Sequence, residues 1–508
     1  MGADQLLLGF VAPIGTDIAQ SLNEFRNYFH NCGYNIIEIK VTDVFKVLEK
    51  HLKPARALAT RPMFNRYQSH IDYGNQIRAF FEDDSALAAI TMGRLIRKRL
   101  KKKISSKDEA FRKNIYLIHQ FKRKEKVDLF RSVYGRLFFQ ISIYSRRGAR
   151  VDYLSRKFSE DAAKSDPKSF RSEAEAIVER DENEIGADHG QRVSTIFHDG
   201  DLIINTDIND PPVRSQVERF CNLLMGSNQE SPTKIEYGMF VAKAAALRTL
   251  DLSRQVGAAI FSGDGEIITM GSNEVPKGTG GTYWGDEKFD DREFKRGIDS
   301  NDKRKKELLR ELISNIGTDA NVDALMKIKR VIESRFMDAL EYGRIIHAEM
   351  SAICDAARLG KSVRSSRMFC TTFPCHMCAK HIVASGIKDV IFLEPYPKSL
   401  ASDLHSDAIA VEGSDRGAYQ DFPAVDFVHF YGVSPRRYRE IFERAGRKDE
   451  ESKFQPWKDG LKQPIVDIKI PFYAQLEEVI VKTFVDSYLK RIAMAPELLD
   501  DESPGQVA

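Results

Sequence analysis

Short apolar runs alternate with helix-like segments over residues 5–208. The strand-like runs are QLLLGFV (5–11), NIIEIKV (35–41), NIYLIHQF (114–121), RLFFQISIY (136–144) and DLIINTD (201–207). Between the first two runs, apolar residues recur with helical spacing until Gly33, at Ile18, Leu22, Phe25 and Phe29. Glycine at that position is typical of a helix C-terminus. The alternation predicts an α/β domain with a mainly parallel sheet.

The alternation of strand-like and helix-like segments ends with a helix over 213–225 and the polar loop GSNQESPT. A different series of helices and strands is expected from about Lys234. A helix at YGMFVAKAAALRTL precedes two apolar-rich runs around Asp264-Gly265, which predict a type I′ hairpin. A charged segment over 285–344 is expected to form helices because its apolar residues keep helical spacing, at Leu308, Leu309, Leu312 and Ile313. Beyond it, we expect a helix at HAEMSAICDAARLG, a strand at RMFCTTF, a helix at PCHMCAKHIVASG and a strand at DVIFLE.

Turn-forming residues and shifts in composition divide the chain into three expected parts. The Asn209-Asp210-Pro211-Pro212 stretch marks the end of an N-terminal domain, 1–212. A second domain covers 213–445 and carries the charged insertion. Residues 446–508 are expected to form a helical extension, with an amphipathic helix over Leu476–Ile492 and an acidic tail. A length of 508 residues is sufficient for two or three hydrophobic cores.

Composition excludes several classes of protein. With 42% hydrophobic and 30% charged residues the chain is typical of globular proteins. Its net charge of 77 − 74 = +3 argues against polyanion binding by the whole surface. No run approaches the ~18 apolar residues of a membrane span, and no basic leader precedes Gln5, so a cytoplasmic location is expected. Six cysteines are too few for a disulfide scaffold, and four of them lie between 354 and 378, which suggests metal binding or catalysis.

The most specific motif of the sequence consists of His347-Ala348-Glu349 and Pro374-Cys375-His376-Met377-Cys378. This is the H-x-E … P-C-x-x-C signature of zinc-dependent nucleobase deaminases. Two cysteines three apart at a helix start place both sulfurs on one side, and a histidine completes three ligands to Zn²⁺, leaving a position for water. Zinc lowers the pKa of that water to about 7. Glu349 is then expected to move protons without binding the metal.

Other interpretations of the cysteine pair are a redox couple or half of a structural zinc site. A redox couple does not need the upstream H-x-E. A structural site needs a fourth ligand, and the spare cysteines, Cys354 and Cys370, lie in apolar runs that predict core positions. His376 lies between the two cysteines, but its spacing points it elsewhere on the helix.

Residues 237 to about 400 resemble the deoxycytidylate deaminase branch of the cytidine deaminase fold. The resemblance is carried by YGMFVAKAAALRTLDLSRQVGAAI, GSNEVPKG, HAEMSAI and TTFPCHMCAKHIVASGIKDVIFLEPY. It implies His347, Cys375 and Cys378 as zinc ligands and Glu349 as proton shuttle. It also implies that Asn273 hydrogen-bonds the bound nucleoside, with Lys277, Arg254 and Lys398 as candidates for the phosphates. The insertion between Trp284 and His347 departs from short family members and holds no cysteine for a second, structural zinc.

A kinase-like P-loop domain ahead of such a deaminase, together with GTYWGDE and EPYPKSLASDLHSDAI, resembles the bacterial anti-phage deoxycytidine nucleotide deaminases. That resemblance implies an N-terminal parallel-sheet domain of P-loop kinase type and an α/β/α deaminase domain. It implies deamination of dCTP and dCMP to dUTP and dUMP, which drains the nucleotide pool that a phage needs. It further implies an inhibitor, a small RNA in some members, and assembly into homo-oligomers.

The N-terminal loop LGFVAPIGTDIAQ has the strand–loop–helix shape of a phosphate-binding loop but lacks its lysine. Gly9, Gly15 and Thr16 are the candidate residues of a P-loop-like site. In the G-x-x-x-x-G-K-[ST] pattern, Gly15 fits the second glycine, whereas Thr16 and Asp17 fall on the lysine and Ser/Thr positions. A carboxylate there would repel phosphate. We therefore expect no phosphoryl transfer and a regulatory role for this domain.

Two further functions stay open. A deaminase that edits a base within RNA or single-stranded DNA is suggested by RLIRKRLKKK (94–103), with seven basic residues in ten. The same run also fits a solvated helix face, with Leu95, Ile96 and Leu100 on one apolar side; if it contacts RNA, we expect a regulatory RNA. An active nucleotide kinase is the third function, and it depends entirely on the N-terminal loop.

Overall fold

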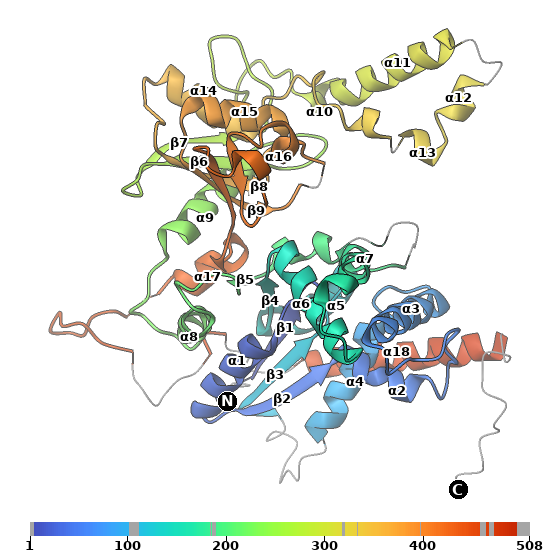
Figure 1. Ribbon diagram of the computed structural model, residues 1–508. Coiled ribbons are helices and arrows are strands. Elements are labelled where there is room, and N and C mark those ends of the chain that lie inside the picture. The colour runs from blue at the N-terminus through green and yellow to red at the C-terminus, as the bar shows by residue number, and fades with distance from the viewer. Residues whose placement is uncertain are drawn as a thin grey trace, which may run out of the picture. The chain divides into compact units, whose positions relative to one another are not determined.

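A computed structural model describes residues 5–100, 111–182, 184, 189–316, 321–332, 334–396, 398–444, 446–457, 464–466 and 472–494. Contacts divide the chain into two compact units (Figure 1). The first unit contains residues 1–232 and 431–508, and the second contains 233–430. The expected boundaries after 212 and 445 differ from this division. Among the described residues, no helix has the length and apolarity needed to span a membrane.

The first unit is built on a six-stranded sheet in the order β12-β5-β4-β1-β3-β2. Its strands are β1 (Gln5–Val11), β2 (Asn35–Lys40), β3 (Asn114–His119), β4 (Phe138–Tyr144), β5 (Leu202–Asn205) and β12 (Gly432–Val433). Strands β1 to β5 pair in parallel, and β12 is antiparallel to β5. The mainly parallel sheet and its five N-terminal strands are confirmed as predicted from the apolar runs.

Helices cover both faces of this sheet. They are α1 (Ala19–Asn31), α2 (Phe45–Leu48), α3 (Met63–Phe81), α4 (Ala86–Leu100), α5 (Lys124–Tyr134), α6 (Arg147–Asp161), α7 (Arg171–Glu182), α8 (Val213–Leu224), α17 (Tyr438–Phe442) and α18 (Tyr473–Met494). On one face, Phe10 of β1 packs edge-on against Phe25 of α1 at 5.4 Å between ring centres. On the other face, Tyr116 of β3 accepts a hydrogen bond from Arg99 of α4 at 2.9 Å.

Long-range contacts explain why α8 and the C-terminal segment belong to the first unit. Phe220 of α8 packs against Phe25 of α1, with 6.5 Å between ring centres. Glu477 of α18 receives two hydrogen bonds from Arg99, at 2.7 and 2.9 Å, and both side chains are at least 98% buried. The helix over 476–492 is confirmed as α18, and it packs into this unit near its start, through Tyr473 and Glu477, whereas Val479 and Leu489 are exposed.

The basic run at 94–103 is only in part a solvated surface. Arg99 is buried, Arg94 pairs with Asp43 at 3.0 Å, and Lys98 donates to the carbonyl of Glu38. Leu95 is buried as expected, but Leu100 is 60% exposed, because it is Arg99 that turns inward. Lys101, Lys102 and Lys103 lie outside the described residues.

The second unit contains a six-stranded sheet in the order β10-β11-β9-β8-β6-β7. Its strands are β6 (Gly257–Phe261), β7 (Ile267–Ser272), β8 (Arg367–Thr372), β9 (Asp389–Glu394), β10 (Ile409–Val411) and β11 (Val425–His429). Strand β6 is antiparallel to β7 and β8, and the other pairs are parallel. Its helices are α9 (Lys234–Ala246), α10 (Glu293–Arg296), α11 (Ser300–Asn315), α12 (Val322–Leu325), α13 (Lys329–Ile332), α14 (Ala348–Arg358), α15 (His376–Ser385) and α16 (Ala401–Leu404).

Helices α14 and α15 pack on the face of this sheet that carries Ile260, Met368 and Cys370. Helix α9 lies on the opposite face, where a Cβ at Gly238 would meet the ring of Phe369 at 2.3 Å. Residues next to each other along a strand point to opposite faces, so the sheet lies between two helical layers (Figure 1).

The hairpin between β6 and β7 forms as predicted, but its turn differs from the expected type I′. Gly265 has a φ of +97°, whereas Asp264 is not among the residues with positive φ. The N–H of Gly265 donates to the carbonyl of Ser262 at 3.1 Å, and Ser262 donates to Glu266 at 2.8 Å. This is a three-residue loop in which only one residue needs the left-handed conformation.

Candidate active site

Two helices of the second unit begin at the same place. His347 is the N-cap residue of α14, Cys375 is the N-cap residue of α15, and Cys378 lies in the first turn of α15. Pro374 therefore lies immediately before the N-cap residue of α15. The Nδ1 atom of His347 lies 3.3 Å from the Sγ of Cys375 and 3.4 Å from the Sγ of Cys378.

Close packing of backbone on backbone brings His347 to this place. A Cβ on Gly271 of β7 would lie 2.1 Å from the carbonyl oxygen of Ala348 and 2.5 Å from the backbone nitrogen of Ala352. Only glycine permits that approach of the strand to the first turn of α14. The helix start is thus held directly against the sheet, and His347 with it.

The three side chains fit a zinc ion. Their ligand atoms all lie within 4.8 Å of one another. Zinc bonds of about 2.0–2.1 Å to nitrogen and 2.3 Å to sulfur separate tetrahedral ligand atoms by about 3.5–3.8 Å, close to the two measured distances. His347, Cys375 and Cys378 are thus the metal-ligand group expected from the sequence, and this cluster could bind a metal ion.

Electrostatics favour the ligand form of Cys375. A hydrogen bond from the Cys378 thiol, together with His347, lowers the pKa of Cys375 to about 4. The hydrogen bond to Cys375 in turn raises the pKa of His347 to about 9. The N-terminus of α15 adds partial positive charge beside the sulfurs, which also favours thiolate. Both effects favour the thiolate form, which is the form that binds a metal ion.

Glu349 lies in the first turn of α14 beside this cluster and is only 4% exposed. Its Oε2 lies 3.6 Å from the Sγ of Cys378. Burial, and then the negative charge of Cys375, raise the pKa of Glu349 to about 7. A carboxyl group with that pKa can both accept and release a proton near neutral pH.

A cavity of about 300 Å³ opens onto the cluster. Asn273 lies on its wall, but its side chain is already engaged: the Nδ2 donates to Asp251 and to the carbonyl of Arg254, and Oδ1 accepts from the N–H of Val256 at 2.7 Å. Both amide hydrogens of Asn273 are thus used to hold the loop before β6. One lone pair of Oδ1 is left for a ligand.

Of the three side chains predicted to contact the substrate phosphates, two line the cavity and one does not. Arg254 and Lys398 line the cavity. The guanidinium of Arg254 lies 3.4 Å from Glu394 and over the ring of Tyr396, at 5.6 Å from its centre. Lys277 does not line this cavity, and its ammonium pairs with Glu287. Geometry thus brings two of the three cations toward the site.

The charged insertion supplies cavity residues that the sequence did not reveal. Asp299, Ser300 and Asn301, at the start of α11, line the cavity together with Arg344. Arg344 bonds Asp291 at 2.9 Å and lies 3.6 Å from Glu293, so the segment is fastened to itself by ion pairs. Its periodicity indicated helices, but nothing in a run of alternating charges shows which residues face a ligand.

The spare cysteines and His376 can now be placed. Cys370 is buried in the core, as expected. Cys354 is exposed, so its predicted core position is wrong: the small alanines at 348, 352 and 356 form the buried side of α14 instead. The ring of His376 lies 3.8 Å from Glu341, outside the group of metal ligands.

In the first unit, the P-loop-like residues form a loop that is already closed by the protein. The N–H of Ile14 donates to the carboxylate of Asp181 at 2.7 Å, and Asp17 accepts from the N–H of Ala19 at the start of α1 at 3.0 Å. Gly15 has a φ of +86°. Gly9 lies within β1, and the hydroxyl of Thr16 is buried without a hydrogen-bond partner in the described part of the chain.

Comparison with known proteins gives matches to the second unit. Residues 232–394 match the family model "Cytidine and deoxycytidylate deaminase zinc-binding region". The deoxycytidylate deaminase of Mus musculus is 28% identical over 158 residues, which are 31% of this chain and 63% of the mouse protein. The chain thus spans less than two thirds of that relative. The deoxycytidylate deaminase of Enterobacteria phage T4 is 48% identical over 54 residues, 11% of this chain and 28% of the phage protein.

A probable deoxycytidylate deaminase of Drosophila melanogaster is 27% identical over 206 residues, covering 39% of this chain and 80% of the fly protein. Among solved structures, the apo dCMP deaminase from cyanophage S-TIM5 aligns with 39% of this chain and 99% of its own, at 17% identity and a TM-score of 0.21. The region that holds His347, Cys375 and Cys378 therefore matches the cytidine and deoxycytidylate deaminase family by sequence.

Proposed function

We propose that the second unit catalyses the hydrolytic deamination of deoxycytidine nucleotides, dCMP and dCTP, to dUMP and dUTP. The observation that carries the proposal is the buried carboxyl group of Glu349, which lines the cavity beside the His347–Cys375–Cys378 cluster. The family-model match over residues 232–394 and the similarity to known deoxycytidylate deaminases support the choice of substrate class.

The chain's own residues would divide the chemistry as follows. His347, Cys375 and Cys378 would hold zinc, which when bound makes hydroxide available near neutral pH. Glu349 would accept the proton of the attacking water and deliver it to N3 of the cytosine ring. A second proton transfer through Glu349 would allow the amino group to leave as ammonia. Water and deoxycytidine nucleotide thus become deoxyuridine nucleotide and ammonia.

Cations at the cavity are suited to the substrate's phosphates. Arg254 and Lys398 would meet them, whereas Lys277 would need to leave Glu287 to do so. The remaining lone pair of Asn273 Oδ1 would accept a hydrogen bond from the nucleoside, and its amide hydrogens hold the loop that carries Arg254. The preference between one and three phosphates would depend on how far these cations reach.

In the cell, this activity would drain the deoxycytidine nucleotide pool in defence against phage, with the first unit and an inhibitor restraining it. The support is the resemblance of the whole chain to anti-phage deaminases, in which a small RNA inhibits some members and the chains assemble into oligomers. The described part of RLIRKRLKKK leaves Arg97 as its exposed cation, so an RNA contact would depend on Arg97 and on Lys101–Lys103.

The test is to incubate the purified chain with dCMP, dCTP, CMP, CTP and a cytidine-containing oligonucleotide, and to identify products by mass. We expect a gain of about one mass unit, from NH to O, on the free deoxynucleotides. Conversion of the oligonucleotide without conversion of dCMP or dCTP would refute the proposal and favour the editing function.

A further inference from the structure

The first unit contains a second cavity, with a volume of about 250 Å³. It lies where β1, β2 and β3 end, because residues just after each strand line it: Ala12 after β1, Thr42 after β2 and Gln120 after β3. The carboxyl edge of a parallel sheet is where ligands bind in α/β folds. In this sheet β1 lies between β3 and β4. The chain therefore leads from β1 to β2 on one side of β1 and later to β4 on the other side, and the cavity lies where the strand order reverses.

Lys126 of α5 lines this cavity and is only 3% exposed. In the described part of the chain, its ammonium has no hydrogen bond and no ion pair. Lys122, on the same wall, lies 2.9 Å from Asp181 and donates to the carbonyl of Ala12 at 2.7 Å. Lysine is almost never fully buried without a partner. Lys122 has such a partner in Asp181, whereas Lys126 has none in the described part of the chain.

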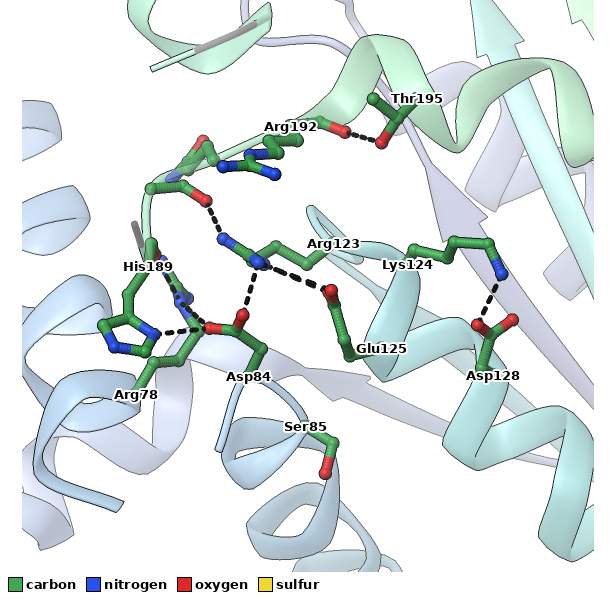
Figure 2. A network of polar contacts seen from close by, with 12 residues as sticks. Arg78, Asp84, Ser85, Arg123, Lys124, Glu125, Asp128, His189, Arg192 and Thr195 are labelled. Atoms are coloured by element: carbon green, nitrogen blue, oxygen red, sulfur yellow. Dashed lines mark hydrogen bonds and ion pairs between the residues drawn. The ribbon is translucent and has the colours of Figure 1, made fainter. Parts of the chain in front are cut away.

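Nearby carboxylates are committed to other groups (Figure 2). Asp84 pairs with Arg123 and lies 2.9 Å from the Nδ1 of His189. Glu125 pairs with Arg123 at 3.1 Å. Burial, and then the positive charges of Arg78, Lys122 and Arg123, lower the pKa of Lys126 well below its usual range. Cationic side chains therefore surround Lys126 where it meets the cavity, and an anion bound there would favour the charged form of Lys126.

Several backbone donors of the loop after β1, which a phosphate loop would use, are already bonded. The N–H of Ile14 donates to Asp181, that of Thr16 to the carbonyl of Pro13, and that of Ala19 to Asp17. An anion in the cavity would thus depend on side chains of the β3–α5 region. Phe45, Tyr67 and His70 also line the cavity, and flat rings of this kind are suited to stacking on a nucleobase.

We propose that this cavity binds a phosphate-bearing ligand, with a nucleoside phosphate as its full-size form, and that Lys126 is the side chain that contacts the phosphate. The aromatic side chains would contact the base. The proposal is independent of the deaminase activity, because its residues all belong to the first unit.

The test is titration calorimetry of the full-length protein with ATP, inorganic triphosphate and adenosine, none of which contains cytosine. We expect ATP to bind, triphosphate to bind more weakly and adenosine weakest of all. Lys126→Met should weaken ATP binding about tenfold or more, because a charge-assisted hydrogen bond is lost. The matched control is Lys124→Met on the same helix, whose side chain is 58% exposed and pairs with Asp128; it should change binding by no more than about twofold.

Equal affinity of the Lys126→Met and wild-type proteins for ATP, or no binding of either phosphate compound, would overturn the proposal. Adenosine binding as tightly as ATP would overturn the role of the phosphate. If Lys126→Met does not fold, hydrogen–deuterium exchange of the wild-type chain decides: ATP should protect peptides covering 12–18 and 120–130. Protection confined to peptides from 233–430 would place ATP in the other cavity and refute the proposal.

Discussion

The deaminase-region cavity and the Lys126 cavity lie at comparable features of their sheets, where strands end and helices begin, yet their helix starts differ. In the second unit, α14 and α15 begin at His347 and Cys375, so both helix starts point at a cluster that could bind a metal ion. In the first unit, Asp17 accepts a hydrogen bond from the N–H of Ala19, the first residue of α1. Asp181 accepts one from the N–H of Ile14 in the preceding loop. The helix starts of the second unit carry side chains that could bind a metal ion, whereas two backbone donors at and before α1 are bonded to the protein's own carboxylates.

This difference shows that the same order of strand, loop and helix does not determine which ligand a site can bind. Both regions present a strand, a loop and a helix in order, and both carry a buried titratable group on the cavity wall, Glu349 in one and Lys126 in the other. What separates them is which donors and acceptors remain unsatisfied. The predictions below test that separation, from the largest expected effect to the smallest.

The largest effect is expected for Cys375→Ala. Removing one of three protein ligands leaves too few to hold zinc, so the purified variant should lose both its metal and its deaminase activity. Metal content by mass spectrometry and product formation from dCMP are the measurements. The control is Cys354→Ala, an exposed cysteine on α14, which should keep about one zinc per chain. A Cys375→Ala protein that retains zinc would exclude this residue from the ligand set.

Glu349→Gln should separate proton transfer from metal binding. The amide keeps the shape of the side chain but cannot act as a base, so activity should fall by ~10²–10⁴-fold. Zinc content should stay at the wild-type level, because Glu349 is not among the metal-ligand group. Loss of zinc together with activity would instead reassign Glu349 to the metal site.

Much of the second unit could be predicted from sequence because its signals are local. The spacing of His347, Glu349, Cys375 and Cys378 places these residues in two short segments, and β7, β8 and β9 follow apolar runs. The cavity wall from the insertion could not be predicted: Arg344 and Ser300 reach it through folding of a charged segment whose periodicity specifies only helices.

In the first unit, the strands were evident but their long-range partners were not. Arg99 and Glu477 are 378 residues apart and pair in the interior, and no local pattern distinguishes this arginine from the other basic residues of 94–103. Lys126 likewise follows three other cations in the run KRKEK. Its burial without a partner depends on where Asp84 and Asp181 lie, which is a property of the folded chain.

A moderate effect is expected for Arg254→Met. Losing one cation from the cavity wall should raise the KM for dCMP about tenfold, with a smaller change in kcat, because the phosphate contact is made in both ground and transition states. Lys277→Met is the matched comparison and should leave KM nearly unchanged, since that ammonium pairs with Glu287 away from the cavity. A larger rise for Lys277→Met than for Arg254→Met would show that Lys277 turns toward the substrate on binding.

The smallest expected effect is none at all: the full-length chain should transfer no phosphoryl group from ATP to a nucleoside or nucleotide. Kinases position phosphates with free backbone N–H groups, a loop lysine and an acidic residue that holds Mg²⁺. Here Asp181 occupies the Ile14 N–H and pairs with Lys122, and Thr16 stands at the position of the loop lysine. A radiolabelled-phosphate assay across common acceptors is the measurement, and turnover near ~1–100 s⁻¹ would contradict the prediction. Binding of ATP at Lys126 without turnover would agree with it, because the cavity holds a cation for phosphate but its acidic residue is already paired.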